Sequence, residues 1–324
     1  MDRRRFLLTS VAGALAAPLA AEAQVGKVAR IGLLSPAPAS AAARSPYDAF
    51  REGLRELGYI EGKNIVLEFR FAGGYARLAE LAADLVRLQV DVIVTDGGNT
   101  TARAAVNATR TIPIVMGTVN DPVADGLVAS LTRPGGNVTG FTFPSVELAG
   151  KRLQLLKEMV PTVTRVAVLW DQTSGLPQFR AAEAAAPSLG VQLESLPVRG
   201  TADLDAVFEA ASRHRAGALL QASSRMLSDN RKAIVERTLK HRIPGMFELG
   251  FPEAGGLAAY GMNVRDNFRR AAVYVDKILQ GTRAGDLPVE QPARFYLVIN
   301  LKTARALGLT IPPSVLLQAT TIIE

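Results

Sequence analysis

The sequence predicts an α/β protein of two similar, doubly wound lobes, and two observations support this prediction. Short apolar segments alternate with amphipathic segments along the 324 residues, which is typical of parallel sheets covered by helices on both faces. The same order of segments also occurs twice, at an offset of about 130 residues. We therefore expect two Rossmann-like halves, each with a parallel sheet, that follow one another along the chain.

Corresponding segments can be matched between the two halves. Each half opens with a predicted strand, at residues 30–34 and 165–169, and a helix then ends at a Leu-Gly pair where glycine adopts the left-handed conformation. The remaining pairs are an extended run, a helix with apolar residues at helical spacing, and a short buried strand. The extended runs are 64–69 and 191–198, the helices carry Leu78, Leu81, Leu85 and Leu88 or Leu204, Val207 and Ala211, and the strands are 92–95 and 218–221.

Glycine and proline mark the segments between the halves. Residues 140–144 link the first half to the second, and residues 260–261 lead out of the second half into a predicted helix at 264–280. A proline-rich stretch at 287–292 then returns the chain to a last strand at 294–299. Such segments allow a few residues to absorb a rotation of rigid lobes, so we interpret them as hinges.

Candidate binding residues follow from the position of the loops. In open α/β sheets the ligand site lies at the carboxyl ends of the strands, and two such edges that face each other would enclose one cleft. Polar residues and glycines follow the predicted strands of both halves at these edges: Ser35, Gly98, Asn99, Thr100, Thr118, Asn120, Asp121, Asp171, Thr173, Ser223, Ser224 and Glu248.

One of these loops has a distinct pattern. The buried strand 92–95 runs into Gly97-Gly98, and a helix led by Asn99 and Thr100 follows. Such a turn presents backbone N–H groups and the positive end of a helix dipole, which suit a phosphate, a carboxylate or an oxyanion. The turn alone does not choose among these anions.

The N-terminus predicts export. Residues 1–23 contain Arg3-Arg4-Arg5, an apolar run from Phe6 to Ala20 and an Ala-x-Ala site, which together indicate a cleaved signal peptide and a periplasmic protein. The arginines followed by Phe6 and Leu7 resemble the twin-arginine export signal. The alternative is a retained membrane anchor, but the apolar run is shorter than the roughly 20 residues that span a bilayer.

Composition excludes several kinds of site. The chain has no cysteine, so it carries no disulfide, no thiolate metal site and no cysteine for lipid attachment. The formal net charge is +7, but the basic residues alternate with acids, as in 51–56 and 231–240, and no basic stripe with aromatic residues occurs. A solvated surface explains this pattern better than a nucleic-acid interface.

The sequence lacks several common enzyme motifs. It has neither a Gly-x-Ser-x-Gly elbow nor a P-loop, and the glycines at 133–140 lack the spacing of a dinucleotide fingerprint. His214 and His241 are the two histidines, and both lie among cationic neighbours near predicted helix ends, so we expect neither a metal nor a cofactor.

Several blocks resemble the substrate-binding proteins of ABC transporters related to tryptophan and aromatic amino-acid binders. They occur in order over essentially the whole mature chain: GLRELGY (53–59), EGKN (61–64), DPV (121–123), RPGGNVTG (133–140), LPVEQP (287–292) and NLKTARALGLTIPPS (300–314). The resemblance implies the type I periplasmic-binding-protein fold with a three-strand hinge. With the hinges above, it predicts an N-terminal lobe of 24–141 plus 262–290 and a C-terminal lobe of 142–261 plus 291–324.

The resemblance also implies a role. A monomeric protein would close over a small ligand and deliver it to a membrane permease driven by ATPase subunits, and its only contact with the membrane would be through that permease. The alternatives are a sensory ligand-binding subunit and, less favoured, an exported α/β enzyme that uses Asp121 and Glu248 across the cleft.

For such a binder, the turn at 96–100 is expected to receive a ligand carboxylate, with an apolar or aromatic amino acid as the first candidate. N–H groups of residues 98–101 and the Thr100 hydroxyl would point at it. Asp121, expected to open a helix, and Glu248 are candidates to bind the ammonium group. Other roles remain open: Asp121 as a helix cap before a proline, Asp96 as a turn cap, and Ser223 and Ser224 as caps of a helix starting near 229. The location of three aromatic side chains is also open, because each could line the cleft or pack in a lobe core: Trp170, Phe247 and Tyr260.

Overall fold

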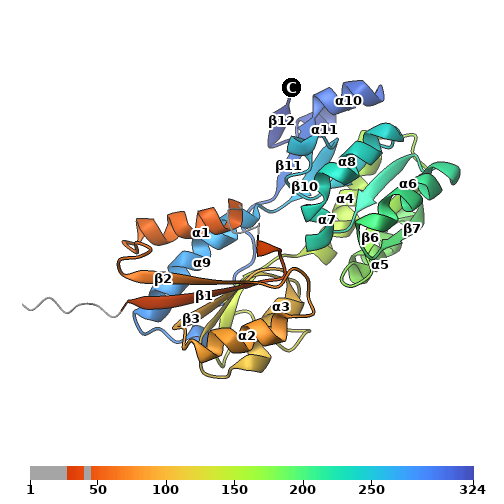
Figure 1. Cartoon of the computed structure of the whole chain (residues 1–324). Coiled ribbons are helices and arrows are strands. Elements are labelled where there is room, and N and C mark those ends of the chain that lie inside the picture. The colour runs from red at the N-terminus through yellow and green to blue at the C-terminus, as the bar shows by residue number, and fades with distance from the viewer. Residues whose placement is uncertain (1–27, 40–44) are drawn as a thin grey trace, which may run out of the picture.

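The computed structural model describes residues 28–39 and 45–324. The predicted signal peptide and residues 24–27 therefore lie outside the described residues. Two sheets, each covered by helices on both faces, form two lobes side by side (Figure 1). The predicted fold class of two similar parallel-sheet lobes is confirmed.

The N-terminal sheet has five parallel strands in the order β2-β1-β3-β4-β5. Helices α1 and α9 pack on one face and α2 and α3 on the other (Figure 1). The strands are β1 (Ala29–Ser35), β2 (Ile65–Phe71), β3 (Val92–Thr95), β4 (Ile114–Val119) and β5 (Val138–Thr142), and the helices are α1 (Ser45–Glu56), α2 (Leu78–Arg87), α3 (Asn99–Ala108) and α9 (Val264–Leu279). All four residues of β3 are β-branched and buried, which is the pattern of a central strand covered on both faces.

The C-terminal sheet has seven strands in the order β12-β11-β10-β9-β8-β6-β7. Its strands are β6 (Arg165–Asp171), β7 (Gln192–Val198), β8 (Ala218–Gln221), β9 (Gly245–Phe247), β10 (Ala258–Gly261), β11 (Tyr296–Asn300) and β12 (Thr321–Ile323). Helices α4 (Ser145–Met159), α5 (Leu176–Ala185), α10 (Leu301–Leu307) and α11 (Pro313–Leu316) cover one face, and α6 (Leu204–Arg213), α7 (Arg225–Asp229) and α8 (Arg231–Lys240) cover the other. Short 3-10 turns lie at Pro187–Leu189, Thr201–Asp203, Pro252–Ala254 and Ala284–Asp286.

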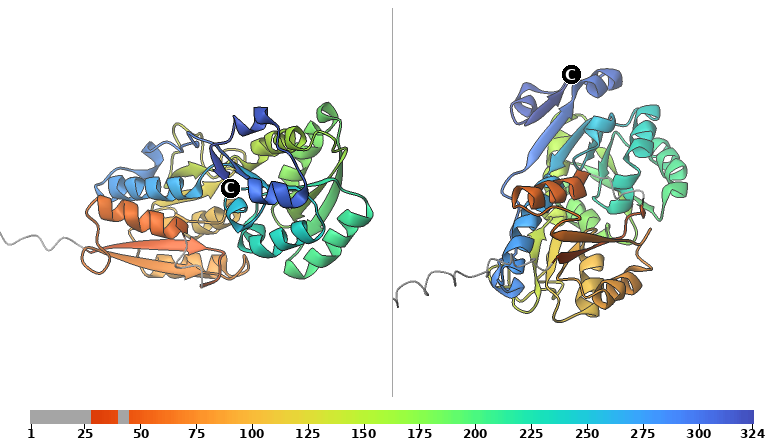
Figure 2. Two further views of the ribbon diagram at one scale, coloured as in Figure 1. Left: turned by 90° about the horizontal axis from the view of Figure 1, so that it is seen from above. Right: turned by 60° about the vertical axis from the view of Figure 1, so that its left-hand side comes forward.

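The described chain passes between the two sheets three times (Figure 2). It does so from β5 into α4, from β10 into α9, and from residue 290 towards β11. The first and third passages lie side by side, because the Thr142 N–H donates to the Glu290 carbonyl at 2.9 Å and the Glu290 N–H donates to the Gly140 carbonyl at 2.9 Å. Two adjacent chain segments therefore connect the lobes at this point.

Most predicted elements occur near their expected positions, with two local differences. Residues 92–95 and 218–221 form strands with the expected bounds, but the last predicted strand starts later, at Tyr296, and pairs antiparallel with β10. The expectation that Asp121 opens a helix is wrong, because turns and bends follow it at residues 122–129. There the N–H groups of Leu127 and Val128 both donate to the Pro122 carbonyl, and Gly126 adopts a φ of 62°, so the chain folds back instead of continuing.

In the described part of the chain, no helix combines the length and the apolar character that crossing a membrane requires.

Candidate functional site

A cavity of about 1320 Å³ lies between the two lobes. Its walls come from loops at the carboxyl ends of strands in both sheets and from the passages between the lobes. Ten of the twelve candidate residues line it: Gly98, Asn99, Thr100, Thr118, Asn120, Asp121, Thr173, Ser223, Ser224 and Glu248. Ser35 and Asp171 are buried beside it and are not among its lining residues.

The wall from the N-terminal lobe is built on the turn between β3 and α3. Gly97 and Gly98 have φ angles of 92° and 84°, and a Cβ on Gly97 would lie 2.4 Å from the Pro36 ring, so glycine is required at Gly97 by both its conformation and its surroundings. The first bond of the helix runs from the Ala102 N–H to the Gly98 carbonyl. The N–H groups of residues 99–101 therefore have no carbonyl partner within the helix, and this end of the helix lines the cavity.

A chain of hydrogen bonds fixes this helix end relative to the neighbouring strand and the hinge. The Asn120 N–H donates to Asn99 Oδ1 at 2.8 Å, and Asn120 Oδ1 accepts from the Ser145 hydroxyl at 2.6 Å. Since Ser145 is the first residue of α4, these contacts connect α3, the end of β4 and the first passage between lobes. Asn99 and Asn120 therefore have structural contacts at the edge of the cavity.

Asp121 caps its own turn. Its Oδ1 accepts from the N–H groups of Val123 and Ala124, at 3.1 and 3.0 Å, while the residue remains exposed at the cavity wall. This is the capping role that the sequence left open, applied to a turn and not to a helix. A carboxylate oxygen has further acceptor capacity, so the cap and a ligand contact are compatible.

The opposite wall contains two adjacent serines with different contacts. Ser224 caps α7, since its hydroxyl accepts from the Leu227 N–H at 3.2 Å. Ser223 accepts from the Arg152 guanidinium at 2.6 Å, and its backbone N–H and carbonyl both bond the Gln178 amide, at 2.6 and 2.8 Å. The helix capped here starts at Arg225, earlier than the position near 229 that the sequence suggested.

Arg152 is a buried cation on α4, only 1% exposed. Its Nε donates to the Tyr260 carbonyl at 2.6 Å, and its Nη2 is one of the buried side-chain atoms that lack a hydrogen-bond partner within the described residues. Burial lowers the pKa of this guanidinium to about 10, while the charge of Glu248 acts in the opposite direction. The group thus stays protonated at neutral pH and places positive charge at the cavity wall.

Glu248 follows β9 and lies near this cation. Burial raises the pKa of its carboxyl above the usual value, and the Ser228 hydroxyl, the charge of Arg152 and the Ser223 hydroxyl act against that shift. The Ser228 hydroxyl donates to Glu248 Oε1, and the Glu248 N–H donates to Gln221 Oε1 at 3.1 Å. The carboxyl is therefore held in place at the cavity wall, and its charge is incompletely compensated.

A direct ion pair crosses from one lobe to the other. Arg225 Nη1 of α7 lies 2.9 Å from Asp96 Oδ2, at the end of β3. The same oxygen accepts from the Tyr47 hydroxyl at 2.6 Å and from the Ser35 hydroxyl at 3.2 Å. Burial and the neighbouring Asp96 both raise the pKa of Tyr47, so its hydroxyl stays protonated and acts as a donor. Ser35 and Asp96 thus have a structural role in this network.

The other candidates beside the cleft have structural partners. Asp171 Oδ1 accepts from the Thr173 N–H and hydroxyl, at 2.9 and 2.7 Å, and so holds its turn. Trp170 stacks on Phe179 and donates from its indole to the Ser195 hydroxyl at 2.8 Å, which is the lobe-core alternative. Phe247 and Tyr260 likewise stack on other aromatic residues, Phe251 and Phe295, and are not among the lining residues.

Apolar surface also lines the cavity. Tyr75 and Phe143 contribute aromatic rings from the N-terminal lobe and the first passage, and their apolar neighbours are Pro46, Val119, Val146, Pro177, Leu249 and Met262. Burial, with smaller contributions from Asp171 and Asp96, raises the pKa of Tyr75 to about 12. Its phenol is therefore neutral at physiological pH. The cavity combines charged groups of both signs with apolar and aromatic walls, the usual composition of a small-molecule site.

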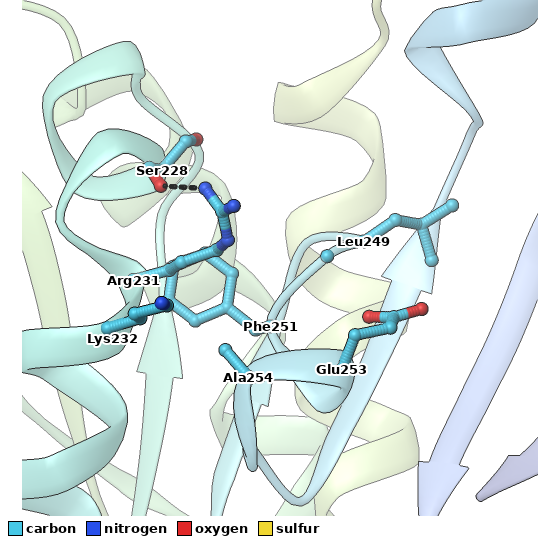
Figure 3. A pocket seen from close by; sticks show the side chains of 8 residues that line it. Ser228, Arg231, Lys232, Leu249, Phe251, Glu253 and Ala254 are labelled. Carbon is cyan, nitrogen blue, oxygen red and sulfur yellow. Dashed lines mark hydrogen bonds between the residues drawn. The ribbon is translucent and has the colours of Figure 1, made fainter. Parts of the chain in front are cut away.

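A smaller cavity of about 290 Å³ opens beside the large one in the C-terminal lobe (Figure 3). The start of α8 lies on one side, where the Arg231 guanidinium donates to the Ser228 carbonyl at 3.1 Å, and Glu253 lies on the other. Arg231, Lys232 and Glu253 also line the large cavity. The smaller cavity is therefore a side extension of the same cleft. Among the described residues, no cluster of three or more His, Asp or Glu side chains could hold a metal ion.

Residues 38–323 match the family model described as ABC transporter substrate binding protein. The chain belongs to this family. This substrate-binding protein is 27% identical over 265 residues to the tyrosine-binding protein of Clostridioides difficile strain R20291, across 80% of this chain and 75% of that protein. Type I periplasmic binding proteins share its fold.

Two solved structures resemble it over 91% of its length. A conserved domain protein from Vibrio cholerae is 28% identical with a TM-score of 0.83, and all of that chain is covered. An ABC domain in complex with L-Trp from Streptococcus pneumoniae is 25% identical with a TM-score of 0.82, and 99% of that chain is covered. The family expected from the sequence motifs is thus confirmed.

The cavity residues that were not expected from the sequence include Tyr75, Arg152, Gln178 and Arg225. For one of them, the sequence pattern does indicate an unusual position. Arg152 occupies the apolar stripe of its helix, at helical spacing from Leu148, Leu155 and Met159, where a cation is out of place unless it has partners inside the fold. Tyr75, Gln178 and Arg225 lie on segments whose spacing gives no such indication.

Proposed function

We propose that this protein is the extracytoplasmic solute-binding component of an ABC importer and that it binds an aromatic amino acid between its lobes. The interlobe cavity carries this proposal, because it offers a helix N-terminus, a partly buried acid and aromatic walls around one space. The tyrosine-binding and L-Trp-bound relatives support this ligand class. The predicted signal peptide supports a periplasmic location.

The ligand carboxylate is proposed to bind at the turn before α3. Three N–H groups at residues 99–101 and the exposed Thr100 hydroxyl are available there. Hydrogen bonds to a charged group contribute about 1.5 to 3 kcal/mol each. The helix dipole adds about 0.3 to 1 kcal/mol at a partly exposed site.

The ligand ammonium is proposed to bind an acid of the cavity wall. Glu248 is favoured over Asp121, because Ser228 and Gln221 already hold it in position and the charge of Arg152 only partly offsets the effect of its burial. Asp121 uses its oxygen to cap a turn. The ring of the ligand would then pack against Tyr75 and Phe143.

The two lobes are proposed to rotate about the three passages, with residues 24–141 plus 262–290 moving against 142–261 plus 291–324. Closure on the ligand would create the surface that a permease with its ATPase subunits recognises. The protein is proposed to act as a monomer and to leave the ligand chemically unchanged.

Thermal unfolding of the mature protein with amino acids, small organic acids, nucleotides and metal ions tests this proposal. A ligand at 100 times its dissociation constant adds about 2.7 kcal/mol to the free energy of unfolding. We expect L-tryptophan or L-tyrosine to raise the melting temperature and calorimetry to give one site per chain. Stabilisation by nucleotides or metal ions alone would contradict the proposed ligand class.

A further inference from the structure

We propose that Asp96 and Arg225 form a latch that stabilises the closed form of the protein and that raises ligand affinity through closure and not through ligand contact. This inference builds on the proposed function, because it concerns how the same cleft opens and shuts. The two residues belong to different lobes, because Asp96 follows a strand of the N-terminal sheet and Arg225 starts a helix of the C-terminal lobe.

The pair is short and shielded. Its nitrogen and oxygen lie 2.9 Å apart, and the two side chains are only 18% and 6% exposed, with Asp96 the more buried. Both residues line the interlobe cavity. Charges in such a place attract each other more strongly than on an open surface, and salt screens them less. The contact therefore favours the arrangement in which the lobes lie together.

Each charge is also positioned within its own lobe. Asp96 receives hydrogen bonds from the hydroxyls of Tyr47 and Ser35, and Arg225 Nε contacts Asp229 at 3.1 Å. Little side-chain freedom is lost when the lobes meet, because both groups are already oriented. The same contacts partly satisfy the charges when the lobes separate. The open form is thus accessible, and the latch is reversible.

Only residues of the chain make the contact, so it favours closure before any ligand arrives. A ligand that binds the closed form then has an apparent dissociation constant equal to its intrinsic constant divided by the closed fraction. Weakening the latch lowers affinity by the amount that the closed fraction falls. This prediction separates a latch from a direct ligand contact, which would lower affinity without changing the empty protein.

The test measures closure in the protein without ligand. The chain has no native cysteine, so spin labels on cysteines introduced at exposed Ala76 and Lys240, which do not line the cavity, report only the distance between lobes. Arg225→Gln and Asp96→Asn each remove one partner, and the double variant removes both. Arg231→Gln is the matched control, because it removes a cation of the same cavity wall whose hydrogen bond to the Ser228 carbonyl stays within its own lobe.

We expect both short and long distances in the parent protein and a closed-to-open ratio lower by on the order of tenfold in each single variant. The double variant should resemble the single ones, because either change already breaks the pair. An unchanged distance distribution in Arg225→Gln and Asp96→Asn, or effects that add in the double variant, would overturn the latch. These measurements need no ligand, so they stand even if the proposed ligand class fails.

Calorimetry with L-tryptophan completes the test. We expect the dissociation constant of each variant to follow from its measured closed fraction. A loss of affinity in Arg225→Gln that exceeds the change in closed fraction, with normal affinity in Asp96→Asn, would assign Arg225 to ligand contact and overturn the proposal.

Discussion

Replacing Glu248 by glutamine tests the electrostatics of the cleft, first in the empty protein. Burial raises the pKa of this carboxyl in the folded state, so between its ordinary pKa and the raised one the folded protein holds a proton that the unfolded chain has lost. The free energy of unfolding of the parent protein should fall as pH rises through that window. Glu248→Gln has no such proton and should lose this pH dependence. The two proteins should therefore differ most above the raised pKa, where the variant is relatively more stable.

The second effect of Glu248→Gln concerns the ligand. The neutral amide keeps the size of the side chain and can still accept from the Ser228 hydroxyl, but it presents no charge to an ammonium group. A hydrogen bond to a charged group contributes about 1.5 to 3 kcal/mol, so the dissociation constant for an aromatic amino acid should rise by about 10- to 150-fold. In the parent protein, affinity should fall by about tenfold per pH unit below the raised pKa, because Glu248 must lose its proton to bind the cation. Glu248→Gln should show no such fall.

Calorimetry across pH, in buffers of different ionisation enthalpy, measures both the affinity and the protons released on binding. Glu253→Gln is the matched control, since it removes an acid from the same lobe and the same cavity wall. Equal affinity and equal proton release in the parent protein and Glu248→Gln would refute the assignment of the ammonium to Glu248.

Three further predictions concern the fold and the N-terminal wall of the cavity. Gly97→Ala combines a φ of 92° with a proline atom 2.4 Å from the new Cβ and should cost about 1 to 3 kcal/mol in urea unfolding, more than Gly126→Ala, where φ is 62° and the surroundings are open. Equal costs would contradict the clash. Phe268→Ala empties a fully buried site and should lower the free energy of unfolding by about 3 to 5 kcal/mol, whereas Val273→Ala, on the same helix but 38% exposed, should stay near the parent value. Thr100→Ala should weaken ligand binding by about 10- to 150-fold without a change in the melting temperature of the empty protein, and Thr100→Ser should restore it, since only the hydroxyl is needed. Unchanged affinity would place the carboxylate elsewhere.

The sequence predicted the architecture because its determinants are local and repeated. The run Val-Ile-Val-Thr at 92–95 has one reasonable reading, a buried strand, and the structure gives it those bounds. The glycines at 58 and 190 adopt the left-handed conformation expected after a helix. The loops at strand ends were also found, because parallel strands bring their carboxyl ends to one edge of the sheet.

Contacts across long sequence distances were not predictable in the same way. Asp96 and Arg225 are 129 residues apart, and no periodicity indicates that their side chains meet. Asp121 was expected to open a helix, because Asp-Pro is a common helix start, but the chain folds back at Gly126 instead. Capping and ligand binding use the same residue types, so the sequence could not separate these roles for Ser224 or Asp121.

A crystal structure of the mature protein with L-tryptophan or L-tyrosine tests the central claim most directly. We expect one ligand molecule between the lobes, with its carboxylate on the N–H groups of residues 99–101, its ammonium on Glu248 and its ring against Tyr75 and Phe143. Electron density for the ligand on one lobe alone, or with its carboxylate away from the start of α3, would contradict it.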